Sequence, residues 1–170
     1  MEAEGLLQIM PKKGAYVPPI TDAQVETVMQ ARALVEDWCV RRAAQLGEGV
    51  ALELDRLLRQ QEELQDSPVA FIECDRQFHR TIVEQAGNPV LADFYESLRD
   101  RQVRMGLYAI AASEKRTRVV LREHQAIVDG VAACDAARSA DAVAAHLAGT
   151  LAALHLPSVA HWVPGPSANS

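Results

Sequence analysis

Apolar residues recur every three or four positions along most of this chain, which is the spacing of one face of an α-helix. The strict alternation typical of a half-buried strand is nearly absent. Capping residues, glycines and prolines divide the pattern into six amphipathic segments. These segments span about 21–46, 50–65, 68–87, 89–108, 113–133 and 139–156. Because the connections between them are short, the pattern predicts an all-α fold, an antiparallel bundle of six helices or of seven.

The first 20 residues have a different pattern. Two short apolar runs, Leu6–Met10 and Ala15–Val17, flank the turn sequence PKKG. They predict a β-hairpin with a basic tip, followed by a linker that Pro18-Pro19 stiffens. A two-stranded hairpin is marginally stable by itself, so we expect it to be the end of a larger unit. The chain therefore divides into the hairpin with its linker, a helical domain and a tail expected to be disordered, at 1–20, 21–160 and 161–170.

Composition and charge narrow the class of protein. The chain has 170 residues and a formal net charge of −6. An acidic body does not favour broad contact with nucleic acid, whose phosphates require Lys and Arg. The three cysteines form no C-x-x-C pair, and without a signal peptide this is typical of a reduced, cytoplasmic chain. No apolar run approaches the ~20 residues of a membrane span, so no membrane partner is expected.

Four side chains that can bind metals fall on the apolar faces of three predicted helices. Asp75 and His79 are one turn apart, and their neighbours on that face are apolar. His124 and His146 lie near the middle of the apolar faces of the last two helices. Burying such groups unpaired costs several kcal/mol, and mid-helix positions meet at one level of a bundle. We therefore expect these four residues to bind a divalent metal ion, zinc foremost, with nickel, manganese and iron as alternatives.

The competing interpretation is that each histidine is an ordinary core residue hydrogen-bonded to a carbonyl group. The other two histidines serve as internal controls. His155 lies half a turn off the face of His146, and His161 lies in the tail. Neither is expected to bind the metal.

Two arginines, Arg32 and Arg101, also fall within apolar faces. A divalent ion held by one carboxylate and neutral imidazoles keeps a charge of about +1 and attracts an anion. Because guanidinium binds carboxylates in a two-pronged geometry, we expect both arginines to bind a small organic acid beside the metal. The alternative is that each buries only its stem and reaches solvent or a local acid, such as Glu36 for Arg32.

Three motifs occur in order along the helical region. They are R-x-x-x-E from Arg32 to Glu36, D-x-x-F-H-x-x-I-x-x-x-x-G-N from Asp75 to Asn88, and E-H-x-x-I-V from Glu123 to Val128. Together they resemble the effector-binding (FCD) domain of FadR-type GntR transcription regulators. The resemblance covers residues 21–156. It implies a homodimer that binds a small carboxylate metabolite, and a metal on the Asp/His/His/His set.

The N-terminal hairpin is similar to the wing that ends this family's winged-helix DNA-binding domain. The helices that would precede the wing, including the recognition helix, are absent from this sequence. Operator DNA is therefore expected as a partner only through a full-length winged helix that this chain does not complete. The expected function is the ligand-sensing domain of a metabolite-responsive transcription regulator, not an enzyme.

Two alternatives stay open, a metal-dependent hydrolase on a helical bundle and a dimerisation module with a structural metal. A hydrolase needs an acid or base beside the metal. Glu73 and Glu123 are near in sequence, but helical geometry turns them about 100° or more away from the ligand faces.

Overall fold

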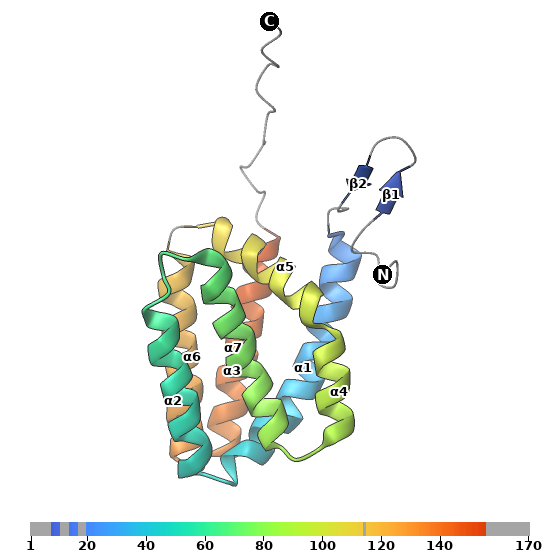
Figure 1. Ribbon diagram of the computed structural model, residues 1–170. Coiled ribbons are helices and arrows are strands. Elements are labelled where there is room, and N and C mark those ends of the chain that lie inside the picture. Colours follow the sequence, from blue (N-terminus) through green and yellow to red (C-terminus); the bar gives the residue numbers. More distant parts are fainter. Residues whose placement is uncertain (1–7, 11–13, 17–19, 114, 156–170) are drawn as a thin grey trace, which may run out of the picture.

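The computed structural model describes residues 8–10, 14–16, 20–113 and 115–155 of the chain. The described part contains seven helices: α1 (Asp22–Ala44), α2 (Glu48–Glu62), α3 (Pro68–Gln85), α4 (Pro89–Ser97), α5 (Arg99–Ala111), α6 (Arg116–Ala132) and α7 (Ala136–Leu154). Figure 1 shows the long helices standing side by side, with α4 beside α1 and α5 crossing the bundle at a slant. Helix α7 packs between α1 and α6, and α3 packs against both α1 and α2. The predicted all-α bundle is confirmed, with the larger of the two helix counts.

The helix ends follow from local chemistry. Thr21 and Gln24 form the capping box that starts α1, each side chain bonding the backbone N–H of the other residue. The last helix begins at Ala136, earlier than the expected start near Ser139. The reason is that Asp135 caps it, accepting a hydrogen bond from the backbone N–H of Arg138.

The N-terminal segment contains two short strands in the described residues. They are β1 (Gln8–Met10) and β2 (Gly14–Tyr16), which pair antiparallel with Ile9 opposite Ala15. The strands lie where the hairpin was expected, and its identity as the remnant of a wing stays a prediction. The turn between the strands, the linker prolines and the tail at 161–170 lie outside the described residues. The division of the chain into three parts stays a prediction.

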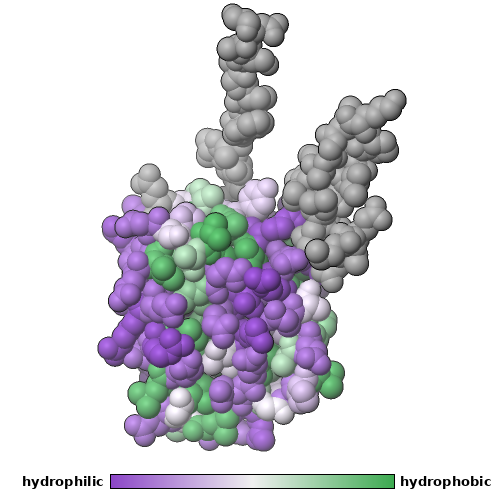
Figure 2. Space-filling view, viewed as in Figure 1, coloured by the Kyte–Doolittle hydropathy of each residue, from purple (hydrophilic) through white to green (hydrophobic). Residues whose placement is uncertain are grey.

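The apolar faces of α1, α2, α3, α6 and α7 form one core. Phe71, Phe78, Ile82 and Ile127 are fully buried in it. By contrast, Leu52, an apolar residue of the periodic pattern, lies on the surface of the bundle. Figure 2 shows polar side chains over most of one face, with smaller apolar patches between them. Among the described helices, none is both long enough and apolar enough to cross a membrane.

Candidate metal centre and adjoining cavity

The four predicted ligands converge inside the bundle. Asp75 and His79 come from α3, His124 from α6 and His146 from α7, and one ligand atom from each lies within 4.8 Å of all the others. The Nε2 atom of His79 is 3.2 Å from Nε2 of His124 and 3.1 Å from Nε2 of His146. The Oδ1 atom of Asp75 is 3.4 Å from Nε2 of His124. The three imidazoles are buried and Asp75 is partly buried.

Each histidine is oriented by an oxygen on the far side of its ring. The contacts are His79 Nδ1 to Glu36 Oε2 at 2.8 Å, His124 Nδ1 to Gln61 Oε1 at 2.8 Å, and His146 Nδ1 to Glu123 Oε2 at 2.9 Å. Carboxylate and amide oxygens only accept hydrogen bonds, so they favour the tautomer with the proton on Nδ1. The three Nε2 atoms then present lone pairs to a common centre, which is the arrangement of histidines that bind a metal.

The residue Gln61 fixes this tautomer on His124. Its Nε2 atom donates to the backbone carbonyl of Phe71 at 3.3 Å and lies 3.5 Å from Asp75 Oδ1. Both of those partners accept, so the amide oxygen is the atom that faces His124. The ring of Phe78 stacks on the His124 imidazole at a centroid distance of 4.2 Å. The imidazole therefore has little freedom to turn away from the centre.

Two Arg–Glu–His chains support the other histidines. In the first, Arg32 Nε donates to Glu36 Oε1 at 2.7 Å, and Tyr95 Oη donates to the same oxygen at 2.7 Å. Burial alone would raise the pKa of Glu36, but the charge of Arg32 outweighs it and, with the hydrogen bonds from His79 and Tyr95, holds the pKa well below its usual range. Glu36 is thus a carboxylate although it is fully buried.

The second chain runs through the other end of the site. Arg116 Nη1 lies 3.0 Å from Glu123 Oε1, and Arg116 Nη2 donates to Thr150 Oγ1 at 2.9 Å. Burial raises the pKa of Glu123, with Arg116 acting in the opposite direction. Glu123 sits off the ligand face of its own helix, as expected, yet it reaches across to His146 on α7.

The donor geometry fits a divalent metal. With metal–nitrogen bonds of about 2.0–2.1 Å, neighbouring nitrogens are about 3.0 Å apart at right angles and about 3.4 Å apart in a tetrahedron. The observed separations of 3.1 and 3.2 Å lie in this interval. Burial lowers the pKa of His124 and His146 well below the usual imidazole value, and the neighbouring histidines lower it further, so protons are poor substitutes for a cation here.

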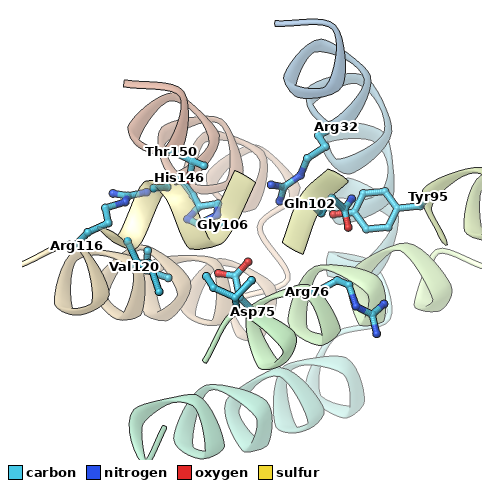
Figure 3. A pocket seen from close by; sticks show the side chains of 13 residues that line it. Arg32, Asp75, Arg76, Tyr95, Gln102, Gly106, Arg116, Val120, His146 and Thr150 are labelled. Carbon is cyan, nitrogen blue, oxygen red and sulfur yellow. Dashed lines mark hydrogen bonds between the residues drawn. The ribbon is translucent and has the colours of Figure 1, made fainter. Parts of the chain in front are cut away.

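A small cavity adjoins the cluster. Its volume is about 20 Å³, and Asp75 and His146 line it together with Arg32 from α1 (Figure 3). The sequence patterns did not indicate several other polar residues on its wall, among them Gln102 on α5 and Arg116 on α6. Both of these are buried, and each lies in a polar stretch of its helix where a solvent-facing position is the ordinary interpretation.

The structure places Arg101 away from this cavity. Arg101 instead lines a separate open hollow of about 480 Å³ with Phe94, Leu98 and residues of α1. The reason is the break at Leu98, which separates α4 from α5, so that the two helices do not continue a single face. Arg32 pairs with Glu36, as the alternative interpretation expected, and it also lines the cavity, so its binding of an organic acid stays a prediction.

The control histidines are also placed. His155 lies outside the cluster, with Nε2 3.5 Å from Glu26 Oε1. His161 lies outside the described residues.

The seven helices of the described residues hold three buried histidines and one partly buried aspartate beside a polar cavity, which defines a helical domain with a candidate metal site. Residues 27–149 match the FCD domain family, and the chain belongs to this family, which supplies the effector-binding domains of GntR-type transcription regulators.

Two curated relatives are similar in sequence. The HTH-type transcriptional repressor RspR of Escherichia coli K12 is 32% identical over 130 residues, covering 71% of this chain and 54% of the relative. The HTH-type transcriptional regulator YdfH of Shigella flexneri matches with the same identity and coverage. The chain thus spans about half the length of the curated relatives it matches.

Two solved structures share the fold. Escherichia coli McbR/YncC superposes with a TM-score of 0.72 at 22% identity, over 88% of this chain and 76% of that one. The metal-free FCD domain of TM0439 superposes with a TM-score of 0.64 at 18% identity, over 81% of this chain and 95% of that one. At these identities the likeness supports the fold and not the ligand.

Proposed function

We propose that this domain senses a small carboxylate at a divalent metal, zinc foremost, held by Asp75, His79, His124 and His146. The observation that carries the proposal is the set of three imidazoles whose Nε2 atoms converge while every Nδ1 faces an acceptor. Three lone pairs aimed at one point repel one another unless a cation lies between them. A single shared proton serves only two of the three nitrogens, whereas a metal ion serves all three.

Charge supports an anionic ligand. Two of the arginines that line the cavity each have a buried or partly buried carboxylate partner, Arg32 with Glu36 and Arg116 with Glu123. A divalent ion with the one carboxylate of Asp75 then leaves a charge of about +1 at the centre. A carboxylate on the metal would neutralise this charge, and the fork of Arg32 is available on the adjoining wall.

The size of the cavity supports a link between binding and conformation. A volume of about 20 Å³ holds about one water molecule. An organic acid is larger, so its binding requires a wall to move outward. Helix α5 supplies Gln102, Gly106, Ala109 and Ile110 to that wall and is therefore the element that ligand binding would displace. Such a difference between two states is what effector coupling requires.

The sensor explains more of the site than either alternative. A hydrolase needs a free acid or base at the metal, but Glu123 is already engaged by His146 and Arg116. A purely structural metal would not need a cavity beside it with buried polar groups on the wall. Both features suit a domain that binds an effector without converting it.

The wider role in regulation follows the family. We propose that the domain works as a homodimer and changes the operator affinity of a winged-helix domain in the full-length regulator. Exposed apolar side chains on α1 (Leu34, Trp38) and α4 (Val90, Phe94) offer surface for a second subunit. The strand pair β1–β2 is consistent with the wing of such a DNA-binding domain.

Metal content tests the ligand set. Native mass spectrometry and elemental analysis of the purified chain should give one metal ion per chain. His124→Ala should lose this ion, because removing one imidazole opens the site and leaves its partner Gln61 unpaired. His155→Ala is the matched control and should keep the metal. A His124→Ala protein that retains stoichiometric metal would show that the ligand assignment is wrong.

Arginine substitutions test the carboxylate. Arg32→Lys keeps the charge beside Glu36 but removes the fork, so the affinity for carboxylates should fall about tenfold while the metal stays bound. Arg101→Lys is the control, since Arg101 lies at the other hollow. Calorimetry with zinc-loaded protein measures both. Equal carboxylate affinities in the wild type and Arg32→Lys would remove Arg32 from the binding site.

A further inference from the structure

Two buried donors on the cavity wall have no hydrogen-bond acceptor within the described part of the chain. They are Nε2 of Gln102 and Nε of Arg116, and each residue is 7% exposed. An unpaired buried N–H costs about 1–3 kcal/mol, so such groups are uncommon in native cores. Two of them on one cavity, next to a candidate metal centre, point to a ligand that accepts hydrogen bonds from both.

The two donors are well separated across the cavity. In Figure 3, Gln102 lies near Arg32 on one side of Asp75, and Arg116 lies near Thr150 on the other. They also belong to different helices, α5 and α6. A ligand that serves both needs oxygen acceptors at two positions, with the metal centre between or beside them.

Charge balance requires the second acceptor of the ligand to be uncharged. The guanidinium groups of Arg32 and Arg116 are already matched by Glu36 and Glu123. The metal with Asp75 leaves a charge of about +1, which one carboxylate neutralises. A second carboxylate would be a buried charge without a partner, and this is costly. The third arginine on the wall adds no free charge, since Arg76 pairs with two glutamates at the surface.

We infer that the effector is a small acid of net charge −1 that carries one carboxylate and, at its other end, a neutral oxygen acceptor such as a hydroxyl, carbonyl or amide oxygen. Gln102 selects this second group, and Arg116, on the other side of Asp75, donates to the carboxylate. The inference rests on the proposed function and adds to it the chemical class of the ligand and two residues that no sequence motif indicated.

The experiment compares matched acids on the zinc-loaded chain by calorimetry, with zinc-free protein as the reference. At three carbons the acids are propionate, 3-hydroxypropionate and malonate. At four carbons they are butanoate, 4-hydroxybutanoate and succinate. At one of the two lengths the hydroxy acid should bind about tenfold more tightly than the unsubstituted acid. This is the gain in affinity expected from one hydrogen bond to a buried donor. The diacid should bind no more tightly than the unsubstituted acid.

Gln102→Met tests the selecting residue. The substitution keeps the volume and removes the amide, so the advantage of the hydroxy acid should fall to about twofold or less. The affinity for unsubstituted acids and for zinc should be unchanged, because α5 supplies none of the four cluster residues. The ligand-free variant should melt higher than wild type, since an unpaired buried amide is removed. Gln125→Met, on the surface of α6, is the matched control.

The outcomes separate the two proposals. If no acid binds the zinc-loaded wild type, the proposed function itself fails. If acids bind but hydroxy and unsubstituted acids are equal at both lengths, or the diacids bind best, the inference fails while the sensor stands. An undiminished hydroxy-acid preference in Gln102→Met would remove Gln102 from the selection.

Discussion

A glycine on α7 makes the second Arg–Glu–His chain possible. A Cβ atom at Gly149 would lie 2.7 Å from Glu123 Oε1 and 3.2 Å from Arg116 Nη1, closer than these groups tolerate. Gly in a helix interior costs about 1 kcal/mol relative to Ala. The close approach of Glu123 to α7, where it orients His146, is a physical reason for accepting this cost.

Gly149→Ala should therefore weaken metal binding about tenfold or more, the usual effect of losing an orienting partner. The added methyl group displaces the Glu123 carboxylate from His146 without touching the four ligands. Competition with a coloured zinc chelator measures the affinity. Gly49→Ala on α2 is the control, because no atom lies within 4 Å of its Cβ position. Equal zinc affinities in the two variants would contradict the orienting role of Glu123.

The two glutamates that orient histidines differ in burial, so we expect their substitution to change the free energy of unfolding by different amounts. Glu36 is fully buried between Arg32 and His79, whereas the Glu123 side chain is 18% exposed. Glu36→Gln leaves a buried guanidinium without its counter-ion and should cost about 3 kcal/mol or more of unfolding free energy. Glu123→Gln should cost less, about 1 kcal/mol, because water already reaches the Glu123 carboxylate and the amide oxygen can still accept a hydrogen bond from Arg116. Urea denaturation of the metal-free proteins compares them, and equal costs would contradict the assignment.

The sequence predicted the four residues that form the cluster but not the residues that orient its histidines. Asp75, His79, His124 and His146 each interrupt an apolar face, so periodicity alone exposes them. Gln61 and Glu123 make their decisive contacts across helices, with His124 and His146. Such contacts depend on how helices are rotated against each other, which no single helical pattern contains. Only Glu36, one turn after Arg32, had a local pattern that could have indicated its role.

At the level of elements, the sequence pattern did not predict the break between α4 and α5, which decides where Arg101 lies. The segment from Pro89 to Tyr108 has one continuous apolar periodicity, which predicted one helix and one face. The structure ends α4 at Ser97 and restarts the chain in α5 at Arg99. Neither glycine nor proline marks the break. Packing against α3 and α1 decides it, and for this reason Arg101 faces the other hollow.

Ion pairs fasten the two short helices over the cavity. Arg76 and Arg80 of α3 both contact Glu96 of α4, and Arg99 of α5 contacts Glu73 of α3. Arg76 itself lines the cavity. These pairs are partly exposed, so each contributes at most about 1 kcal/mol. Together they disfavour local opening of α4 and α5, but they are too weak to determine the global fold.

Glu96→Gln should therefore speed hydrogen exchange at α4 and α5 amides several-fold, while the melting temperature falls by only a few degrees. The association of carboxylates with the zinc-loaded protein should become faster, since the wall opens more often. Glu53→Gln, which breaks an ion pair with Arg56 on α2, is the control. Exchange rates in α4 and α5 that do not change would contradict the proposed opening.

Over the whole molecule, the metal centre and the cavity join most of the helices. The four cluster residues come from α3, α6 and α7, and the partners that orient the histidines come from α1, α2 and α6. Helix α5 supplies the wall that the proposed function requires to move. Arg32 and Arg116 each contact a glutamate that orients a histidine of the cluster, so an anion bound to either arginine is linked to a candidate metal ligand. A metal bound only by the folded state stabilises the fold by about 2.7 kcal/mol at a concentration 100-fold above its dissociation constant.

The same centre makes the stability of the metal-free protein depend on pH. Burial lowers the pKa of His124 and His146 below the value of about 6.5 that they have in the unfolded chain. As the pH falls below about 6.5, the unfolded chain takes up protons that the folded chain does not. Stability is then lost at about 1.4 kcal/mol per pH unit for each histidine. Asp75 and Glu123, whose pKa values burial raises, act in the opposite direction at more acidic pH.

The melting temperature of the chelator-treated protein should therefore fall between about pH 7 and pH 5.5, within the window set by the unfolded imidazole. Saturating zinc should hold the melting temperature nearly level across that range, because the metal keeps the histidines unprotonated until it dissociates. His155→Ala, which removes a partly exposed imidazole far from the centre, should leave both profiles unchanged. A metal-free profile that is flat over this range would mean that the histidines of the cluster are accessible to protons in the folded chain. Their convergence on a cation would then have no energetic support.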